Sequence, residues 1–344
     1  MPAPISELLP LDRLLPWLSA HVPGFAGPVE AKQFASGQSN PTFHLRAASG
    51  DYVLRRKPPG ILLKSAHAVD REFRVQRALS ATAVPVPEMI ALCADDAVLG
   101  AAFYVMDFTS GRNFLDPRLP DLAPADRGAI MDEMNRVLAA LHGVDVAAVG
   151  LSDYGPPGNY FERQTGRWAK QYRASETGTI ADMDALIAGL LARMPKDDGR
   201  RCLVHGDYRI DNMIFAADGP ECRAVLDWEL STIGHPFADL AAVIMQWHMP
   251  PGDAGRGLAG VDRASLGLPS DDAFIAAYCD RLGIGGIDDF GFYLGFCFFR
   301  MGAIIQGVKK RALDGNASNP ERALDLGKHV PVFAAKGLEA LGHG

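Results

Sequence analysis

The chain has 344 residues, of which 48% are hydrophobic and 22% charged, and its formal net charge is −7. A chain of this length exceeds one typical core and predicts about two domains or lobes, with the composition of an ordinary globular protein. The acidic balance argues against a nucleic-acid partner, because phosphate contacts need a basic face and the sequence shows none.

The cysteines and the apolar stretches favour a cytoplasmic enzyme without a membrane partner. Five cysteines are scattered along the chain and form no C-x-x-C pair, which fits a reducing compartment better than disulfides or a zinc site. The N-terminus has no basic region before its apolar residues, so no signal peptide is expected. The most apolar long stretch, Gly291 to Ile305, contains Arg300 and is too short to cross a bilayer.

The N-terminal part of the chain predicts a helix followed by a polar turn. Leucines recur at helical spacing in residues 5–21, and strand-like ends in residues 32–45 flank the turn Ser36–Asn40. Small residues let backbone N–H groups approach an anion closely, although this turn taken alone favours an ordinary hairpin. The chain contains no P-loop motif.

A strand at Tyr52–Arg55 ends at Pro58-Pro59-Gly60, and the next helix is expected at Ser65–Ser80. Glu72 falls on the packed face of that helix, among apolar residues. An acid at such a position needs a cation from elsewhere in the fold, unless it lies at the edge of the face and reaches solvent.

Two further strands, Met89–Leu92 and Ala102–Met106, are expected to complete a small lobe. The polar connector Thr109-Ser110-Gly111 follows them, so the domain break is expected near residues 108–111. We therefore predict an N-terminal lobe of residues 1–108 and a C-terminal lobe of residues 109–344.

The rest of the chain is mainly helical by its apolar periodicity. Helices are expected at residues 125–143, 161–174, 182–194, 240–247, 272–282 and 288–310. The second of these helices carries residues that could line an acceptor pocket, although an exposed face is the commoner explanation: Arg163, Arg167, Trp168, Lys170, Tyr172 and Arg173. Arg300 interrupts an apolar stretch, so it is either buried and paired or points into a pocket where it could receive an anionic substrate group.

Most of the candidate chemistry lies in Arg201–Glu229. The apolar runs of this segment predict one strand and then a hairpin, whose tight turn contains the Asp-Gly and Gly-Pro pairs of residues 217–220. Such a hairpin would bring Asn212, just before its first strand, beside Asp227, just after its second. Asp207 stands on the loop that precedes the hairpin.

This set of side chains suits phosphoryl transfer. Mg²⁺ prefers hard oxygen ligands and retains several waters, so the Asp227 carboxylate and the Asn212 amide oxygen would suffice beside phosphate oxygens. Asp207 could orient an acceptor hydroxyl and take its proton. Four residues separate Asp207 from Asn212, as in the kinase catalytic loop. Taken singly, each of these acids is more often a structural residue than a catalytic one, and the alternative for the whole segment is a loop of solvated acids near a hairpin turn.

The motif H-G-D-x-x-x-x-N at residues 205–212, followed by a hairpin and D-W-E, resembles the aminoglycoside phosphotransferase and choline kinase group. The resemblance implies an α+β, protein-kinase-like bilobal fold with a small antiparallel-sheet N-lobe and a mostly helical C-lobe. It also implies ATP and Mg²⁺ as cofactors. In this group Asp207 would be the catalytic base with Arg209 near the transferring phosphoryl group, while Asn212 and Asp227 would bind the metal.

The same resemblance assigns residues of the N-terminal lobe to nucleotide binding. The polar turn matches the group's G-x-S-N-x-T pattern at Gly37, Ser39, Asn40 and Thr42. Arg55 stands where kinases place the lysine that contacts phosphates and pairs with a helix glutamate, so Glu72 is its expected partner. A solvated basic strand end is the alternative for Arg55. Asp107 and Phe108 are the hinge candidates, whose backbone would hold adenine.

Two longer matches, Y-V-L-R-R-K-P-P-G and F-R-x-x-x-I-x-Q-G-V, resemble the branch related to the kinase domain fused to some acyl-CoA dehydrogenases. That branch is associated with phosphorylating hydroxyacyl thioesters, so a hydroxyacyl-CoA is a candidate acceptor. In the group an aspartate at the position of Asp239 braces the catalytic turn. The alternatives are an aminoglycoside or other small-alcohol kinase, a nucleotide-binding pseudokinase scaffold and, more weakly, a metal hydrolase that uses His205.

Overall fold

In the computed structural model of the chain, the described residues are 8–34, 40–58, 68–252, 255–317 and 319–342. They form two compact units. Unit 1 comprises residues 1–114, 146–151 and 210–231, and unit 2 comprises residues 115–145, 152–209 and 232–344. The division into lobes at residues 108–111 stays a prediction. By its contacts, the hairpin segment 210–231 groups with the N-terminal part of the chain.

Unit 1 is built on a five-stranded antiparallel sheet in the order β1-β2-β3-β5-β4. Its strands are β1 (Val29–Gln33), β2 (Thr42–Ala47), β3 (Gly50–Arg56), β4 (Met89–Cys93) and β5 (Phe103–Asp107). The three strands predicted after the polar turn are confirmed, with ends shifted by one or two residues. The register of β2 and β3 places Thr42 opposite Arg55.

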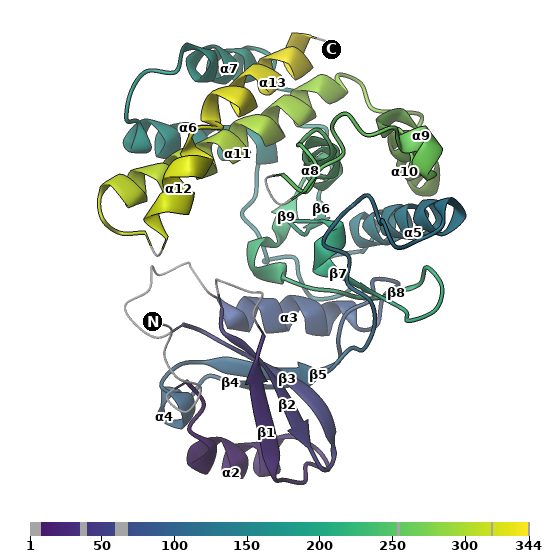
Figure 1. The fold of residues 1–344 in the computed structure, drawn as a ribbon, viewed down its shortest axis with the longest axis vertical. Helices are drawn as coiled ribbons and strands as arrows, with labels where there is room; N and C mark the ends of the chain where they lie inside the picture. The colour runs from purple at the N-terminus through teal and green to yellow at the C-terminus, as the bar shows by residue number, and fades with distance from the viewer. Residues whose placement is uncertain (1–7, 35–39, 59–67, 253–254, 318, 343–344) are drawn as a thin grey trace. The chain divides into compact units, whose positions relative to one another are not determined.

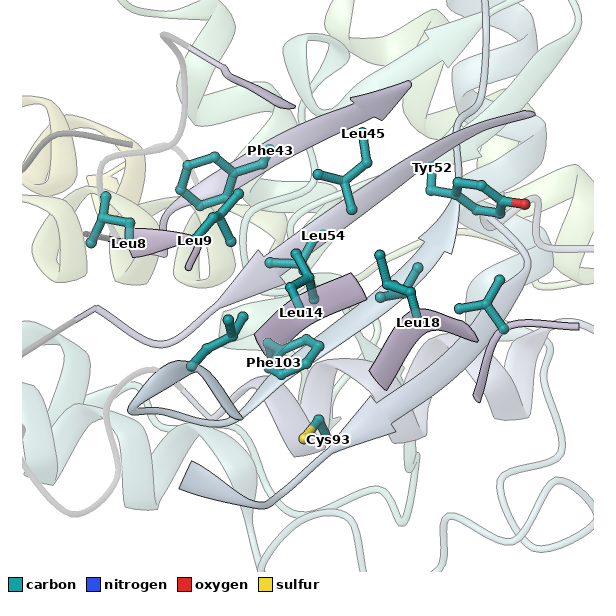
Figure 2. Close-up of a cluster of buried hydrophobic side chains, with 13 residues drawn as sticks. Leu8, Leu9, Leu14, Leu18, Phe43, Leu45, Tyr52, Leu54, Cys93 and Phe103 are labelled. Carbon is teal, nitrogen blue, oxygen red and sulfur yellow. The ribbon is translucent and has the colours of Figure 1, made fainter. Parts of the chain in front are cut away.

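Two helices cover the two faces of this sheet, α2 (Leu11–His21) on one side and α3 (Val69–Leu79) on the other (Figure 1). Figure 2 shows the cluster on the α2 side, which includes Leu14, Leu18, Phe43, Leu45, Leu54 and Phe103. Because successive strand residues point to opposite faces, Leu54 lies toward α2 and its neighbour Val53 packs in the α3 cluster. By the same alternation, the side chain of Arg55, two residues after Val53, points to the α3 side of the sheet, where it is buried.

A separate hairpin in unit 1 lies between Asn212 and Asp227. β7 (Met213–Phe215) and β8 (Cys222–Val225) pair antiparallel, with Met213 opposite Val225. The Leu226 N–H donates to the carbonyl oxygen of Asn212 at 2.8 Å, which extends the pairing by one residue on each strand. The hairpin predicted from the turn signals is confirmed.

The connector after β5 is bonded to this hairpin. Arg112 and Phe215 exchange two backbone hydrogen bonds of 2.8 Å, and the Arg112 Nε–H donates to the carbonyl oxygen of Ala216. Only glycine fits at position 111, because a Cβ there would collide with the carbonyl oxygen of Phe215. These contacts explain why a segment from the middle of the chain belongs to unit 1.

Unit 2 is mostly helical (Figure 1). Its longer helices are α5 (Pro124–His142), α6 (Tyr160–Ser175), α7 (Ala181–Ala192), α8 (Phe237–Trp247), α10 (Asp271–Leu282), α11 (Phe290–Leu313), α12 (Pro320–Gly327) and α13 (Val330–Gly342). Helix α11 contacts α6, α7, α8, α12 and α13, so it forms the centre of the unit. The six predicted helices are confirmed, while α12 and α13 are additional to them.

In unit 2, β6 (Cys202–Val204) and β9 (Thr232–Gly234) form a short antiparallel pair of strands, and the H-G-D turn of residues 205–207 directly follows β6. The sequence predicts β6 from its apolar run but does not predict β9, because Ile233 is the one apolar residue of that strand. β6 contacts α5, and α8 begins soon after β9. The turn that follows β6 is thereby held between two helices of one unit.

Helix α11 is longer than the apolar stretch Gly291 to Ile305, which by its length was predicted to be too short to cross a membrane. It has 24 residues and a mean hydropathy of 1.3 over its most apolar window, which by length and composition is enough to cross a bilayer. The exclusion by length is therefore wrong. In unit 2, however, 67% of that window is buried, as in the core helix of a globular protein.

Candidate active site

The guanidinium of Arg55 lies among three carboxylates of unit 1. Its Nε lies 2.8 Å from Glu72 Oε2, and its Nη2 lies 2.9 Å from Asp227 Oδ1. The Arg55 side chain is 10% exposed and that of Glu72 is 1% exposed. The expected pair of Arg55 and Glu72 is thus present, and the solvated strand end is excluded for Arg55.

Three further side chains of unit 1 complete this cluster. The Asn40 amide donates to Glu72 Oε1 at 2.9 Å and lies 3.4 Å from Glu229 Oε2. The Tyr104 hydroxyl donates to Glu72 Oε2 at 3.2 Å, and Glu229 Oε2 lies 3.5 Å from Arg55 Nη2. Glu72 therefore accepts on both oxygens, which fixes the orientation of the carboxylate that holds Arg55.

One guanidinium in this cluster faces three carboxylates, and the pKa values reflect that imbalance. Burial raises the pKa of Glu72 to about 7, against the charge of Arg55, and the carboxylates of Asp227 and Glu229 add to the rise. Burial alone would lower the pKa of Arg55, but the three carboxylates raise it above its usual value. Arg55 therefore stays charged, whereas burial moves the pKa of Glu72 toward neutral pH.

The two proposed metal ligands lie at the two ends of the β7–β8 hairpin. Asn212 ends the short helix η1 (Ile210–Asn212), and Asp227 precedes η2 (Trp228–Leu230). Asp227 has a left-handed backbone with φ 66° and ψ 59°, a conformation that is costly for a residue other than glycine. Strain of this kind persists where the surrounding structure fixes it, here through the ion pair with Arg55 and the packing of η2.

The donor chemistry at these hairpin ends fits Mg²⁺. Asp227 offers a carboxylate and Asn212 an amide oxygen, which are the hard ligands that this ion takes alongside water and phosphate. In the described part of the chain, no group of three or more His, Cys, Asp or Glu side chains is placed to hold a metal. This leaves the metal hydrolase built on His205 without a site there.

The polar turn before β2 is described only in part. Gly37 and Ser39 lie outside the described residues, so their predicted contact with phosphate stays a prediction. Thr42 donates its hydroxyl to the carbonyl oxygen of Asn40 at 3.0 Å. The Asn40 side chain is fully buried on Glu72, so in this structure it braces the Arg55 pair. Its proposed role in nucleotide binding would be exerted through that pair.

The hinge candidates end strand β5. The N–H of Asp107 donates to the carbonyl oxygen of Glu88 at 2.9 Å, and that of Phe108 donates to Asp51 at 3.3 Å. The ring of Phe108 is 36% exposed and stacks on His44 with ring centres 4.6 Å apart. Both N–H groups serve the sheet, so a contact with adenine at these two residues would use their carbonyl oxygens or the Phe108 ring.

In unit 2 the H-G-D sequence forms a turn that is fastened by a buried acid. Asp239, at the start of α8, accepts the N–H of His205 at 2.5 Å and the N–H of Gly206 at 2.9 Å. Gly206 has φ 83°, in the left-handed region that favours glycine. The role of Asp239 as a brace of the catalytic turn is visible in these two bonds.

Asp239 is itself held by a buried network. His142 Nε2 lies 3.4 Å from Asp239 Oδ2, and His142 Nδ1 lies 2.6 Å from the Tyr278 hydroxyl. These distances indicate that Nε2–H donates to the carboxylate while Nδ1 accepts from the phenol. Burial would raise the pKa of Asp239, but the hydrogen bonds from His142 and from the Gly206 N–H, together with the nearby imidazoles of His142 and His205, lower it below its usual value.

Asp207 lies at the end of this turn. Its N–H donates to His205 Nδ1 at 3.3 Å, and its carboxylate lies 3.9 Å from Arg209 Nε. The side chain of Asp207 is 37% exposed and that of Arg209 is 26% exposed. Tyr208, between them, is buried and donates its hydroxyl to the carbonyl oxygen of Met134 at 2.8 Å. The backbone is thus anchored on both sides of a partly exposed acid.

The sequence of the chain matches a known protein family. Residues 30–290 match the model of the group described as APH, the phosphotransferase enzyme family. The chain belongs to this family. The match covers the described sheet of unit 1 and the catalytic segment, and it assigns the chain as a phosphotransferase that acts on hydroxyl groups.

Curated relatives of this phosphotransferase are longer proteins. It is 47% identical to acyl-CoA dehydrogenase family member 10 of Mus musculus over 85% of its length, and 41% identical to family member 11 of Rattus norvegicus over 94%. The chain spans only 27% of the first relative and 42% of the second. It therefore corresponds to one part of each of these proteins.

Solved structures share the fold of this phosphotransferase. A presumed aminoglycoside phosphotransferase from Ralstonia eutropha is 48% identical, with a TM-score of 0.89 over 96% of this chain and 98% of that one. A thermostable mutant of APH(4)-Ia in a ternary complex with ADP and hygromycin B is 16% identical, with a TM-score of 0.62 over 96% and 98%. The predicted protein-kinase-like fold is confirmed.

Two residues of the site lie outside the set that the sequence motifs assign. Tyr104 and Glu229 both contact the Arg55 pair, directly or through Glu72. Glu229 is the last letter of D-W-E, so its place in the motif was a signal for it. Tyr104 alternates with apolar residues in strand β5, and nothing in the sequence distinguishes its hydroxyl from that of any core tyrosine.

Proposed function

We propose that the chain is an ATP- and Mg²⁺-dependent kinase that transfers the γ-phosphoryl group to a hydroxyl of a small molecule, with a hydroxyacyl-CoA as the acceptor. The observation that carries the proposal is the Arg55 guanidinium, which contacts Glu72 and Asp227 at once. In protein kinases a cation held by a helix glutamate contacts the nucleotide phosphates, and an aspartate after a hairpin binds the metal.

The roles in unit 1 concern the nucleotide. Asp227 and Asn212 would hold Mg²⁺, which would supply positive charge to offset the negative charge of the phosphates. Arg55 would contact the phosphates, and Glu72 would keep its guanidinium in place. The APH(4)-Ia complex contains ADP, which supports nucleotide use in this fold.

The roles in unit 2 concern the acceptor. Asp207 would accept a hydrogen bond from the acceptor hydroxyl, orient it and take its proton as the new bond to phosphorus forms. Its partial exposure suits a group that must meet a substrate, and the Asp239 brace suits a group that must be held still. Arg209 would lie near the transferring phosphoryl group, as its spacing from Asp207 implies.

A hydroxyacyl-CoA acceptor is supported by the relatives. The chain is similar over 85% and 94% of its length to parts of two proteins named acyl-CoA dehydrogenases. A kinase in the same polypeptide as such an enzyme would act on a substrate of related chemistry. The second candidate is an aminoglycoside or other small-alcohol kinase, which the names of the solved structures favour.

The proposal is tested by an acceptor screen. Purified chain with ATP and Mg²⁺ is offered hydroxyacyl-CoA, aminoglycoside and choline acceptors, and the product is detected by mass spectrometry as a gain of one phosphoryl group. We expect phosphorylated hydroxyacyl-CoA, formed about two to four orders of magnitude more slowly by the Asp207→Asn variant. A product only from aminoglycosides would transfer the proposal to the second candidate, and ATP binding without any product would indicate a pseudokinase scaffold.

A cytoplasmic location is part of the proposal. The five cysteines are buried and none of them forms a disulfide in this structure, as expected in a reducing compartment.

A further inference from the structure

Helices α6 and α11 bring several cations to one place in unit 2. The guanidinium carbon of Arg167 lies 5.6 Å from the ring centre of Trp168, and that of Arg300 lies 6.0 Å from the same ring. Arg163 stands one helical turn before Arg167, on the same side of α6. One indole thus has two guanidinium groups over it, with a third arginine next to them on α6.

Arg163 and Arg300 also converge, on Tyr160 at the start of α6. Burial raises the pKa of Tyr160 to about 12, and the positive charges of Arg300 and Arg163 act against that rise. Both arginines therefore lie near one buried phenol. The packing of α11 against α6 holds them there.

The charge of this cluster is not compensated within the part of the chain that the structure describes. No carboxylate of the residues seen in unit 2 lies within ion-pair distance of Arg163, Arg167 or Arg300. On the same helix, Arg173 contacts Glu176 at 2.7 Å and pairs with Asp184. The contrast shows that Arg173 of α6 is paired with carboxylates, whereas Arg163 and Arg167 of the same helix are not paired with any among the described residues.

Two donors in the cluster lack an acceptor. Arg163 Nε and Trp168 Nε1 are buried, and neither has a hydrogen-bond partner among the described residues. Buried donors are nearly always paired in folded proteins, because an unpaired one destabilises the fold. An acceptor oxygen supplied by a ligand would remove that cost.

The cluster borders the turn that carries Asp207. Arg300 Nη2 donates to the carbonyl oxygen of Gly206 at 2.9 Å, and Gly206 is the residue before Asp207. Asp239, a buried acid that also acts on Tyr160, is already engaged by the N–H groups of His205 and Gly206. A group bound by these arginines would therefore lie beside the candidate base, in the same unit.

We propose that Arg163, Arg167, Arg300 and Trp168 form a subsite for an anionic group of the acceptor, a carboxylate or a phosphate. Arginine is suited to both, because its planar fork donates two parallel hydrogen bonds to either anion. The same charges would repel a polycationic acceptor such as an aminoglycoside. This inference rests on the proposed function, and it assigns the acceptor to the class of organic anions.

Direct binding tests the subsite without relying on turnover. Calorimetric titrations are made on the full chain with saturating ADP and Mg²⁺, so that the nucleotide site is filled. The ligands are CoA, 3-hydroxybutyrate and uncharged pantetheine. Binding of CoA alone would identify a phosphate as the anion, and binding of 3-hydroxybutyrate alone a carboxylate. We expect at least one of the two anions to bind, and pantetheine to bind much more weakly.

The variants Arg163→Gln and Arg167→Gln remove one charge each, and each should weaken binding of the anion about tenfold, the effect of one charged hydrogen bond. Arg173→Gln is the matched control, since it removes the same charge from the same helix but from a paired arginine, and it should bind as the wild type does. The subsite is refuted if neither anion binds the wild type, or if both variants bind like the control.

Phosphoryl transfer from ATP is measured separately on the same proteins. In the two variants, the KM for hydroxyacyl-CoA should be raised and the KM for ATP should be unchanged. If the wild type binds CoA yet transfers phosphate to no acceptor, the proposed function fails while the subsite stands. If it transfers phosphate with a KM that the variants leave unchanged, the subsite fails and the kinase stands.

Discussion

Replacing Asp239 by alanine tests how the H-G-D turn is held. In the structure its carboxylate accepts two backbone N–H groups, those of His205 and Gly206, and lies 3.4 Å from His142 Nε2. The site is fully buried, with Asp239 1% exposed and His205 0%. Alanine would leave both N–H groups without an acceptor, and water has little access to replace the carboxylate.

The expected cost follows from those bonds. Each buried N–H that loses its acceptor costs about 1–3 kcal/mol, so two of them cost about 4 kcal/mol. Asn at the same position keeps one oxygen acceptor and should cost about half of that. Against a typical stability of about 5–15 kcal/mol, the alanine variant should fold but unfold at clearly lower denaturant concentration.

Two measurements check the prediction. Urea unfolding followed by circular dichroism gives the loss of stability, and hydrogen exchange read by mass spectrometry gives the local effect at residues 202–209. A loss of about 4 kcal/mol would accelerate exchange of that peptide about a thousandfold where local opening governs it. Asp280→Asn, at an exposed position of α10, is the control and should change neither quantity.

Acid should reproduce part of the effect. Because the pKa of Asp239 is lowered in the folded state, its contribution is present above the ordinary aspartate pKa of 3.8 and is lost as the pH falls through the folded-state value. The wild type should therefore lose stability below about pH 4 more steeply than Asp239→Asn does. If Asp239→Ala unfolds and exchanges like the control, the acid does not hold the turn and the reasoning is wrong.

Three further predictions concern the catalytic groups. Asp207→Asn should lower kcat by about two to four orders of magnitude and leave the Kd for ATP unchanged; an unchanged kcat would refute the base assignment. Asp227→Asn should raise the Mg²⁺ concentration needed for half-maximal activity, in a titration at fixed ATP, more than Asp218→Asn in the hairpin turn does. The folded-state pKa of Glu72 is raised to about 7, so its contribution to stability is present below 4.5 and lost as pH rises through 7. The unfolding free energy of the wild type should therefore fall by about 3 kcal/mol between pH 5 and 8, and that of Glu72→Gln should not show this fall.

The parts of the site that could be predicted from the sequence are those with a local spacing signal. The Asp-Gly and Gly-Pro pairs predict the turn between β7 and β8, and the turn predicts that residues 212 and 227 flank one hairpin. The spacing of Asp207 and Asn212 within one motif predicts their roles. Each inference uses residues fewer than about twenty positions apart, where the geometry of a turn or strand limits the alternatives.

The contacts that could not be predicted join residues far apart in the chain. Tyr104 meets Glu72 across 32 positions, and Asn40 meets Glu229 across 189. Arg300 reaches Gly206 across 94 positions. No periodicity in one sequence specifies such pairings, because they depend on how helices and sheet pack. The length of the apolar stretch in α11 could not decide the environment of that helix for the same reason, because the environment depends on burial in unit 2.

The packing also explains why an arginine can stand where kinases use a lysine. Lysine offers its charge at one nitrogen, whereas the fork of Arg55 presents Nε to Glu72 at 2.8 Å and Nη2 to Asp227 at 2.9 Å. The same nitrogen lies 3.5 Å from Glu229, the third acid of the cluster. One planar cation thereby joins the acid of α3 to both acids of D-W-E. In this phosphotransferase, positions 55, 72, 227 and 229 consequently form one electrostatic unit, and a change at any of them alters the charge that the others experience.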